Sequence, residues 1–313
     1  MDGIEVEIHH GLGPLDQADV TELLAVAAAV DGHAALSEQK RIEFDAGSTG
    51  AAIGARSLAR HVSSGRLVGY GHLSRGNESW GIEIVIHPDR RGSDAESLGS
   101  VLLGSLLEEI GRQGGGRVYF WAPRAEAVHD RIAEDNGLQA GRDLIQMRIP
   151  LPLARPSHDG GEGLETRAFR PGHDEAAWLA VNNRAFASHP EQGGWSMEDL
   201  LGREREGWFD PAGLLLYEVD GRLAGSCWTK IHRDADPPLG EIYVISVDPD
   251  FQGRGLGRSL TEAGLSWLAH AGIKVGMLYV DGDNVAAVKL YRSMGFTDDH
   301  VDRAYTGAID ASR

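Results

Sequence analysis

Apolar side chains recur along this chain with the two-residue period of strands and the three-to-four-residue period of helices, in a mixed order. Over residues 1–149 the pattern predicts strands and helices interspersed. The predicted segments are Glu5–Ile8, Asp16–Val30, a short helix from Ser37, Leu67–Leu73, Ile82–Ile86, Leu98–Ile110, Val118–Trp121, Ala125–Glu134 and Leu144–Ile149. This mixture indicates an α/β fold.

A similar order begins again after a break. Residues 150–163 hold Pro150, Pro152 and Pro156 and an Asp-Gly-Gly turn, which are typical of a linker. The segments predicted beyond it are Leu164–Phe169, Glu175–Phe186, a helix capped by Ser196, Leu214–Val219, Leu223–Ile231, Val244–Val247, a helix carrying Leu260, Leu265 and Leu268, and Val275–Val280. We therefore expect two lobes, 1–149 and 164–313.

The two halves share local sequence as well as element order. The run from Gly81 to His87-Pro88 aligns with the run that ends at Asp248-Pro249, and Asn136-Gly137 falls where Met294-Gly295 falls. A repeat of roughly 150 residues indicates a duplicated domain, since solenoid repeats are much shorter.

Length and charge narrow the possible functions. The 313 residues suit two domains, and the net charge of −17 argues against nucleic acid or an anionic membrane as a partner. The single cysteine, Cys227, excludes an intrachain disulfide and a multi-cysteine metal site. No basic and apolar leader opens the sequence, and no apolar run approaches the ~20 residues that span a bilayer. We expect a cytoplasmic monomer.

A glycine-rich loop carries the clearest chemical signal. The β-branched run stops at Asp248-Pro249, and Gln252-Gly253-Arg254-Gly255-Leu256-Gly257-Arg258 then opens an amphipathic helix. Glycines let the backbone approach a ligand, and the first turn of a helix offers unpaired N–H groups, so the loop suits a pyrophosphate. The spacing differs from the dinucleotide pattern Gly-x-Gly-x-x-Gly, and no Lys-Ser/Thr pair follows as in a P-loop.

Two motifs together give a resemblance to a known family. Gln252-x-x-Gly255-x-Gly257, followed by Asn284-x-x-Ala287-x-x-x-Tyr291-x-x-x-Gly295-Phe296, resembles the GNAT superfamily of acetyltransferases. The resemblance implies two tandem lobes, each a mixed, mostly antiparallel, splayed sheet flanked by helices, and acetyl-CoA as the acyl donor. The coenzyme-binding residues that it implies are Ile245, Ser246, Val247, Gln252, Gly253, Arg254, Gly255, Leu256, Gly257, Arg258, Asn284, Val285, Ala286, Ala287, Val288 and Lys289, with Ile84, Val85 and Ile86 in the first half.

Two side chains are candidates for the proton transfers of an acetyltransferase. Glu241 lies at the start of the strand that leads to the loop, and a carboxylate there is a suitable general base for an amine nucleophile. Tyr291 lies on the helix after Asn284, and its phenol can protonate the departing thiolate. The alternatives are a solvated glutamate at a strand end and a tyrosine of the core.

The first half lacks these groups. With Pro88 set on Pro249, Trp80 stands opposite Glu241, and Ala133 stands opposite Tyr291. In this alignment the glycine-rich loop corresponds to Arg91 to Glu96, where Asp94 and Glu96 would face the phosphates. In the alternative alignment, an insertion of about five residues pairs Leu98-Gly99 with Leu256-Gly257. Both alignments predict a non-catalytic first lobe.

The tandem arrangement resembles the branch of the superfamily that completes mycothiol. That resemblance implies acetyl transfer to the cysteinyl amine of cysteinyl-glucosaminyl-inositol. The acceptor contacts that it implies are Glu38, Glu191, Lys230, Glu241 and Tyr279. Other possibilities are an acetyltransferase for other small-molecule or peptide amines, and a CoA-binding sensor without turnover. We expect no metal, because His232, Asp234 and Asp236 belong to a Pro-rich turn.

Overall fold

The computed structural model describes residues 3–45, 54–76, 79–154, 164–187, 193–233 and 235–312. The chain divides into two compact units. Unit 1 comprises Met1–Leu144 and His300–Arg313, and unit 2 comprises Ile145–Asp299. Most of the expected linker lies outside the described residues.

Unit 1 is built on strands in the order β1-β2-β3-β4-β5-β12. The first four are antiparallel neighbours, β4 and β5 are parallel, and β5 and β12 are antiparallel. Its elements are β1 (Ile4–His9), α1 (Pro14–Asp31), α2 (Glu38–Asp45), β2 (Gly54–His61), β3 (Leu67–Arg75), β4 (Ser79–Ile86), η2 (Pro88–Arg90), α3 (Ala95–Arg112), β5 (Gly116–Ala122), α4 (Ala127–Asp135) and the start of β6 (Gln139–Pro150).

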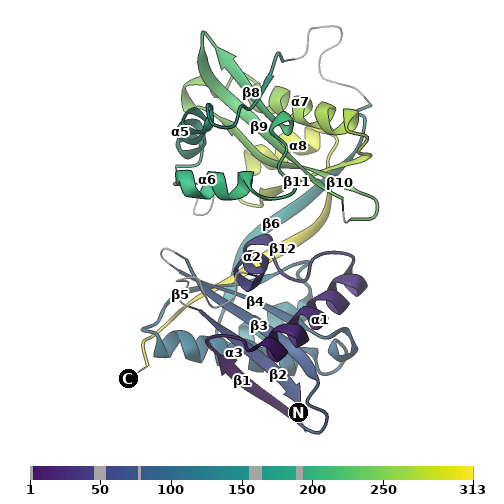
Figure 1. The fold of residues 1–313 in the computed structure, drawn as a ribbon, viewed down its shortest axis with the longest axis vertical. Helices are drawn as coiled ribbons and strands as arrows, with labels where there is room; N and C mark the ends of the chain where they lie inside the picture. Colours follow the sequence, from purple (N-terminus) through teal and green to yellow (C-terminus); the bar gives the residue numbers. More distant parts are fainter. Residues whose placement is uncertain are drawn as a thin grey trace. The chain divides into compact units, whose positions relative to one another are not determined.

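Unit 2 repeats this plan with strands in the order β6-β11-β10-β9-β8-β7 (Figure 1). Strands β7 to β10 are antiparallel neighbours, and β10 and β11 are parallel. Its elements are β7 (Arg167–Ala168), α5 (Glu175–Ala185), α6 (Met197–Glu204), η3 (Pro211–Gly213), β8 (Leu214–Val219), β9 (Arg222–His232), β10 (Leu239–Val247), η4 (Pro249–Phe251), α7 (Leu256–His270), β11 (Val275–Asp281), α8 (Val285–Met294) and the start of β12 (Thr297–Ile309).

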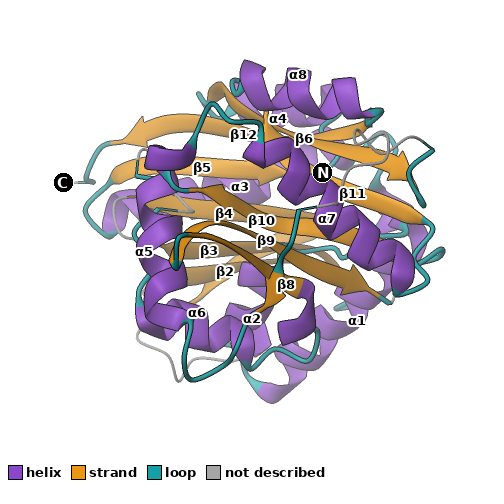
Figure 2. Cartoon of the chain, turned by 90° about the horizontal axis from the view of Figure 1, so that it is seen from above, coloured by secondary structure: helices purple, strands orange, loops and turns teal. Residues whose placement is uncertain are grey.

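Helices cover both faces of each sheet, so each unit has a core on either side of its strands (Figure 2). In unit 2, Trp178 of α5 packs on Trp228, while Leu260 and Leu265 of α7 pack on the opposite face. Burying each such leucine contributes about 1.5–3 kcal/mol. A Cβ at Gly264 would lie 2.4 Å from the Cys227 sulfur, so only glycine lets α7 approach β9 this closely. The helix is thereby held against β9, the neighbour of the strand that leads into the glycine-rich loop.

The last strand of each half crosses the division between the units. Residues 303–309 of β12 pair with β5, and the Arg303 guanidinium bonds to Asp143 at 2.7 and 3.0 Å, all within unit 1. The Tyr305 hydroxyl donates to Asp130 at 2.7 Å in the same unit. The compact units therefore differ from the expected ranges 1–149 and 164–313, because alternation shows which face a strand buries but not which sheet it joins.

Three elements differ from the expectations, and for one of them, β12 (Thr297–Ile309), no strand was predicted. Strand β2 was not predicted, since Gly54–His61 carries arginines and a serine in place of a clear apolar alternation. The strand expected at Leu164–Phe169 shortens to the two residues of β7. No helix among the described residues is long and apolar enough to cross a bilayer.

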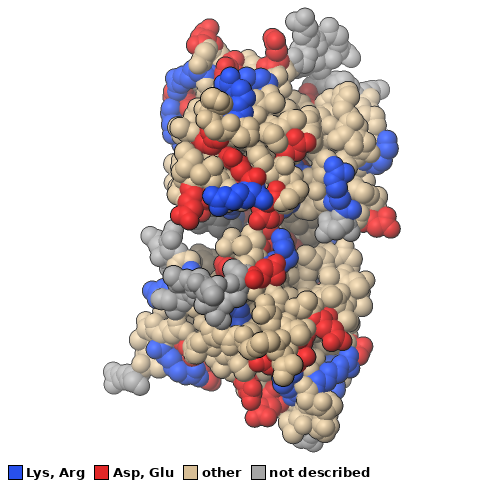
Figure 3. Space-filling view, viewed as in Figure 1, with Lys and Arg blue, Asp and Glu red and all other residues tan. Residues whose placement is uncertain are grey.

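The surface carries both signs of charge. On the face shown in Figure 3, Lys and Arg side chains lie among Asp and Glu side chains. Some of these charged side chains form ion pairs, as Arg60 does with Asp16 at 2.8 Å. The excess of acid in the composition therefore coexists with local basic positions on this face.

Candidate active site

The sheet of unit 2 opens between β10 and β11. The two strands pair from Leu239 with Val275 to Ile242 with Leu278, but β10 continues to Val247 and β11 to Asp281. At the same point the pairing of β10 with β9 shifts by one residue between Ile242 and Val244. A bulge of this kind bends a strand. The sheet is therefore splayed from Tyr243 onward.

The backbone of β10 offers hydrogen-bonding groups to this opening. The Asp248 N–H donates to the Ala224 carbonyl at 2.9 Å, so every second residue of β10 bonds to β9. The groups of the alternate residues, Ile245 and Val247, consequently point to the β11 side. Ser246 belongs to the other set, and its hydroxyl lies 2.9 Å from that of Ser226 in the interior.

The loop after β10 forms a cradle of backbone N–H groups. Gly253 and Gly255 have φ of 76° and 78°, a left-handed conformation that residues with a Cβ adopt only at a cost. Within the described part of the chain, the backbone N–H groups of residues 253–257 have no hydrogen-bond acceptor. Helix α7 begins at Leu256, so its positive dipole end adds to these donors. The loop has the properties of an anion site.

The side chains around the cradle come from the loop itself, from the start of α7 and from α8. Arg254 lies over the Phe251 ring at 5.3 Å, and the Arg258 guanidinium donates to Ser293 of α8. The Gln252 amide donates to the Val247 carbonyl at 3.2 Å. In α8, Asn284 caps the helix by accepting from the Ala287 N–H at 3.1 Å. Of the remaining expected contacts in α8, Val285, Ala286 and Lys289 are exposed, and Val288 is buried in the core.

Glu241 shares one face of the sheet with two of the expected acceptor contacts. It lies opposite Lys230 on β9, and Tyr279 is on the same face two residues beyond Met277, its partner on β11. Glu241 is buried, with 8% of the residue exposed, and its carboxylate lies 2.7 Å from His232 Nε2. The Lys230 ammonium lies 4.4 Å from the centre of the Trp208 ring. The alternative of a solvated glutamate is wrong, because this side chain is buried.

Tyr291 lies on α8 with its ring in the core. It packs edge-on against Phe296, with ring centres 5.7 Å apart, and is 7% exposed. Burial raises the pKa of Tyr291 to about 12, and the neighbouring Cys227 acts in the same direction. Within the described residues its hydroxyl has no hydrogen-bond partner. The phenol therefore stays protonated at neutral pH, the state that an acid requires.

Two further expected contacts lie elsewhere. Glu38 is the first residue of α2 in unit 1, and Glu191 falls outside the described residues. Sequence reasoning missed Gln146 of β6, whose amide donates to the Tyr279 hydroxyl at 2.7 Å, and the pairing of His232 with Glu241. Only strand register could have revealed either pair, because their members come from different strands.

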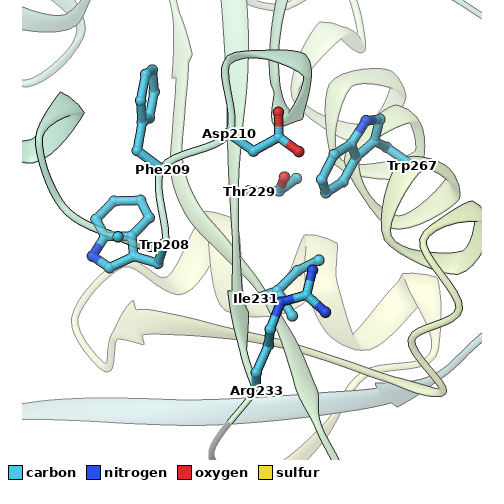
Figure 4. Close-up of a pocket in the computed structure, with 8 residues that line it drawn as sticks. Trp208, Phe209, Asp210, Thr229, Ile231, Arg233 and Trp267 are labelled. Carbon is cyan, nitrogen blue, oxygen red and sulfur yellow. The ribbon is translucent and has the colours of Figure 1, made fainter.

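A pocket of about 490 Å³ lies on the other face of β9. Thr229 and Ile231 line it, and they alternate with Lys230 along the strand. Figure 4 shows Trp267 of α7 on one side and the Arg233 guanidinium near Ile231. Thr229 and Ile231 thus face away from Glu241, whereas Trp208, whose ring Lys230 contacts, also lines the pocket. Within the described residues no group of three or more His, Cys, Asp or Glu side chains could hold a metal ion.

The equivalent positions of unit 1 are occupied by a buried polar network. In unit 1 the strand pairing places Ser74 opposite Gly81, and in unit 2 it places Lys230 opposite Glu241. The counterpart of Glu241 is therefore Gly81 and not Trp80. The expected alignment was one residue out because β4 lacks the bulge of β10. The alignment without an insertion is otherwise supported, since α3 and α7 each begin seven residues after the aligned prolines.

Lys40 of α2 fills the place that a side chain at Gly81 would take. Its ammonium donates to the Gly81 carbonyl at 3.1 Å and lies 3.1 Å from the position of a Cβ there. Burial lowers the pKa of Lys40, although Glu43 and Glu83 act in the opposite direction. Glu83 in turn accepts from the Ser37 N–H at 2.8 Å. These contacts tie α2 to the strands.

Comparisons with known proteins agree with this architecture. A model of the acetyltransferase (GNAT) family matches residues 169–296. The mycothiol acetyltransferase of Thermobispora bispora is 44% identical, over 96% of this chain and 99% of its own, and that of Streptomyces coelicolor is 43% identical over 93% and 91%.

Solved structures show the same fold. A GCN5-related N-acetyltransferase from Sphaerobacter thermophilus has a TM-score of 0.73 at 23% identity, over 100% of this chain and 98% of its own. A tandem GNAT protein from the clavulanic acid biosynthesis pathway has a TM-score of 0.70 at 17% identity, over 99% and 100%. The mixed α/β, tandem fold expected from the two motifs is confirmed.

Proposed function

Since the chain belongs to the mycothiol acetyltransferase family, we propose that unit 2 carries its catalytic site and that the acceptor is the cysteinyl amine of cysteinyl-glucosaminyl-inositol. The observation that carries this proposal is the opening between β10 and β11, which leads from Glu241 to the cradle of free N–H groups. A thioester substrate and its phosphates need these features in that order.

The coenzyme would lie along the second half of β10. The backbone groups of Ile245 and the N–H of Val247, which point to the β11 side, suit the amides of a pantetheine arm, in the way that an added strand pairs with a sheet edge. The N–H groups of residues 253–257 suit the pyrophosphate, with Arg254 and Arg258 as nearby charges. Helix α8 borders the start of α7, since a Cβ at Gly257 would lie 3.8 Å from the Leu290 side chain.

The two proton transfers are assigned to Glu241 and Tyr291. The Glu241 carboxylate takes a proton from the acceptor amine, directly or through water, as the nitrogen attacks the thioester carbon. The Tyr291 hydroxyl donates toward the departing sulfur. We propose that Lys230 and Tyr279, on the same face as Glu241, bind the sugar hydroxyls. The roles of Glu38 and Glu191 in acceptor binding stay predictions.

Unit 1 is proposed to be catalytically silent. Lys40 occupies the place of the base, and Ala133 replaces the acid. Asp94 stands before α3 with a right-handed backbone, where unit 2 has the left-handed Gly255. The strand residues Ile84, Val85 and Ile86 retain the register of their counterparts in β10, so coenzyme binding without turnover in this unit stays a prediction.

Mass-spectrometric turnover of acetyl-CoA against a panel of amines tests the proposal. Cysteinyl-glucosaminyl-inositol should be acetylated with a kcat/KM far above those of aminoglycosides and peptides. Glu241→Gln should lower this rate on the order of 10²-fold or more. Preference for a peptide or an aminoglycoside would contradict the proposed acceptor, and binding of acetyl-CoA without any turnover would favour the sensor. Cytoplasmic location, a monomeric state and independence from metal also stay predictions.

A further inference from the structure

His232 and Glu241 form a pair across β9 and β10. Register places His232 opposite Leu239 and Glu241 opposite Lys230, so the two side chains are diagonal neighbours on one face. Their nearest atoms, Nε2 and Oε2, are 2.7 Å apart. An ionised carboxylate can only accept hydrogen bonds, so the imidazole must donate from Nε2.

The two members of the pair differ in exposure. The Glu241 side chain is 10% exposed, and that of His232 is 28% exposed. A buried carboxylate is costly unless its oxygens are hydrogen-bonded, and a bond to a charged acceptor is also stronger than one between neutral groups. The imidazole therefore supplies a hydrogen bond that offsets part of the cost of burying this carboxylate, and it holds one of the two oxygens in place.

We propose that His232 is a positioning residue for the base. Its Nε2–H holds Oε2 of Glu241, so that Oε1 is directed to the acceptor amine. The proton of the amine passes to Oε1, the nitrogen lone pair forms the new bond to the acetyl carbon, and the carbon–sulfur bond breaks. The sulfur leaves with that electron pair and receives the proton of Tyr291. This inference rests on the assignment of Glu241 as the base under the proposed function.

Two substitutions separate positioning from packing. The side-chain nitrogen of His232→Gln can reach the place of Nε2, whereas that of His232→Asn is too short to do so. Loss of a hydrogen bond to a charged group should cost about 10- to 100-fold. We therefore expect His232→Asn to lower kcat by that factor with the KM for acetyl-CoA unchanged, and His232→Gln to stay within about threefold of wild type.

A double-mutant cycle makes the test specific to the pair. In the Glu241→Gln background, His232→Asn should cause no further loss in kcat with acetyl-CoA and cysteinyl-glucosaminyl-inositol. Equal losses in His232→Gln and His232→Asn, or a full additional loss in the Glu241→Gln background, would overturn the inference. An inactive Glu241→Gln beside a fully active His232→Asn would refute the role of His232 alone. A fully active Glu241→Gln would refute the base itself.

A measurement independent of turnover completes the design. The ¹⁵N spectrum of the His232 imidazole, recorded at pH 9, should show the Nε2–H tautomer. The Nδ1–H tautomer would mean that Nε2 does not donate to Glu241, and the inference would fall even if acetyl transfer were normal.

Discussion

Removing the Tyr291 hydroxyl gives the sharpest prediction, because burial decides how strong an acid this phenol can be. Burial raises its pKa to about 12, whereas a thiol such as that of the coenzyme has a pKa near ~8.5. Complete transfer of the proton to a free thiolate would thus be uphill by about 3.5 units, or roughly 5 kcal/mol at 1.36 kcal/mol per unit. The phenol can still hydrogen-bond to the sulfur as charge develops on it.

The expected loss in Tyr291→Phe is therefore at the lower end of the range for a general acid, about 10²-fold in kcat. The active form of the phenol is the protonated one, and it would be lost only as the pH rises toward 12. Between pH 6 and 10 the variant should follow the wild-type pH profile, lowered by a constant factor. Thiol release from acetyl-CoA, measured across this range, checks both the factor and its constancy.

Two controls make the Tyr291→Phe result interpretable. The variant should unfold within about 3 °C of wild type, since the hydroxyl has no hydrogen-bond partner among the described residues and its removal is nearly neutral. A thioester with a more acidic thiol should reduce the loss. A kcat ratio of one between wild type and variant at every pH would show that Tyr291 has only a packing role. A kcat ratio that falls to one between pH 8 and 10 would refute the elevated pKa of Tyr291.

Three further predictions follow from particular contacts. Gly255→Val forces a side chain into φ of 78°, at a cost of about 1–2 kcal/mol, and should lower kcat/KM for acetyl-CoA about 10²-fold. The matched Gly92→Val should leave activity within threefold, because Gly92 has no positive φ and open space around it. Burial lowers the pKa of His72 to about 4, so the neutral ring should contribute stability that is complete above pH ~6.5 and falls by about 3 kcal/mol toward pH 4. Hydrogen exchange of β3 amides should show this loss in wild type and not in His72→Gln. Gln146→Leu removes the donor to Tyr279 and should raise the KM for the acceptor about fivefold with that for acetyl-CoA unchanged.

The sequence by itself determined the fold class, the duplication and the place of the cradle. These features are local. Asp248-Pro249 ends a strand, and glycines at 253 and 255 are needed where φ is positive. The conformation of such residues can be predicted without knowledge of the rest of the chain. The order of Gly255 and Tyr291 along the chain likewise carried the family resemblance, which full-length relatives confirm.

Only the tertiary structure decided what depends on strand pairing. The bulge at Tyr243 moved the counterpart of Glu241 from Trp80 to Gly81, and pairing across β9 and β10 placed His232 against the base. The sequence also did not show that β6 and β12 each cross the boundary between the two units. A strand's own pattern records which of its faces is buried, but its neighbours are chosen by side chains distant in sequence, so register and partnership emerge only when the chain has folded.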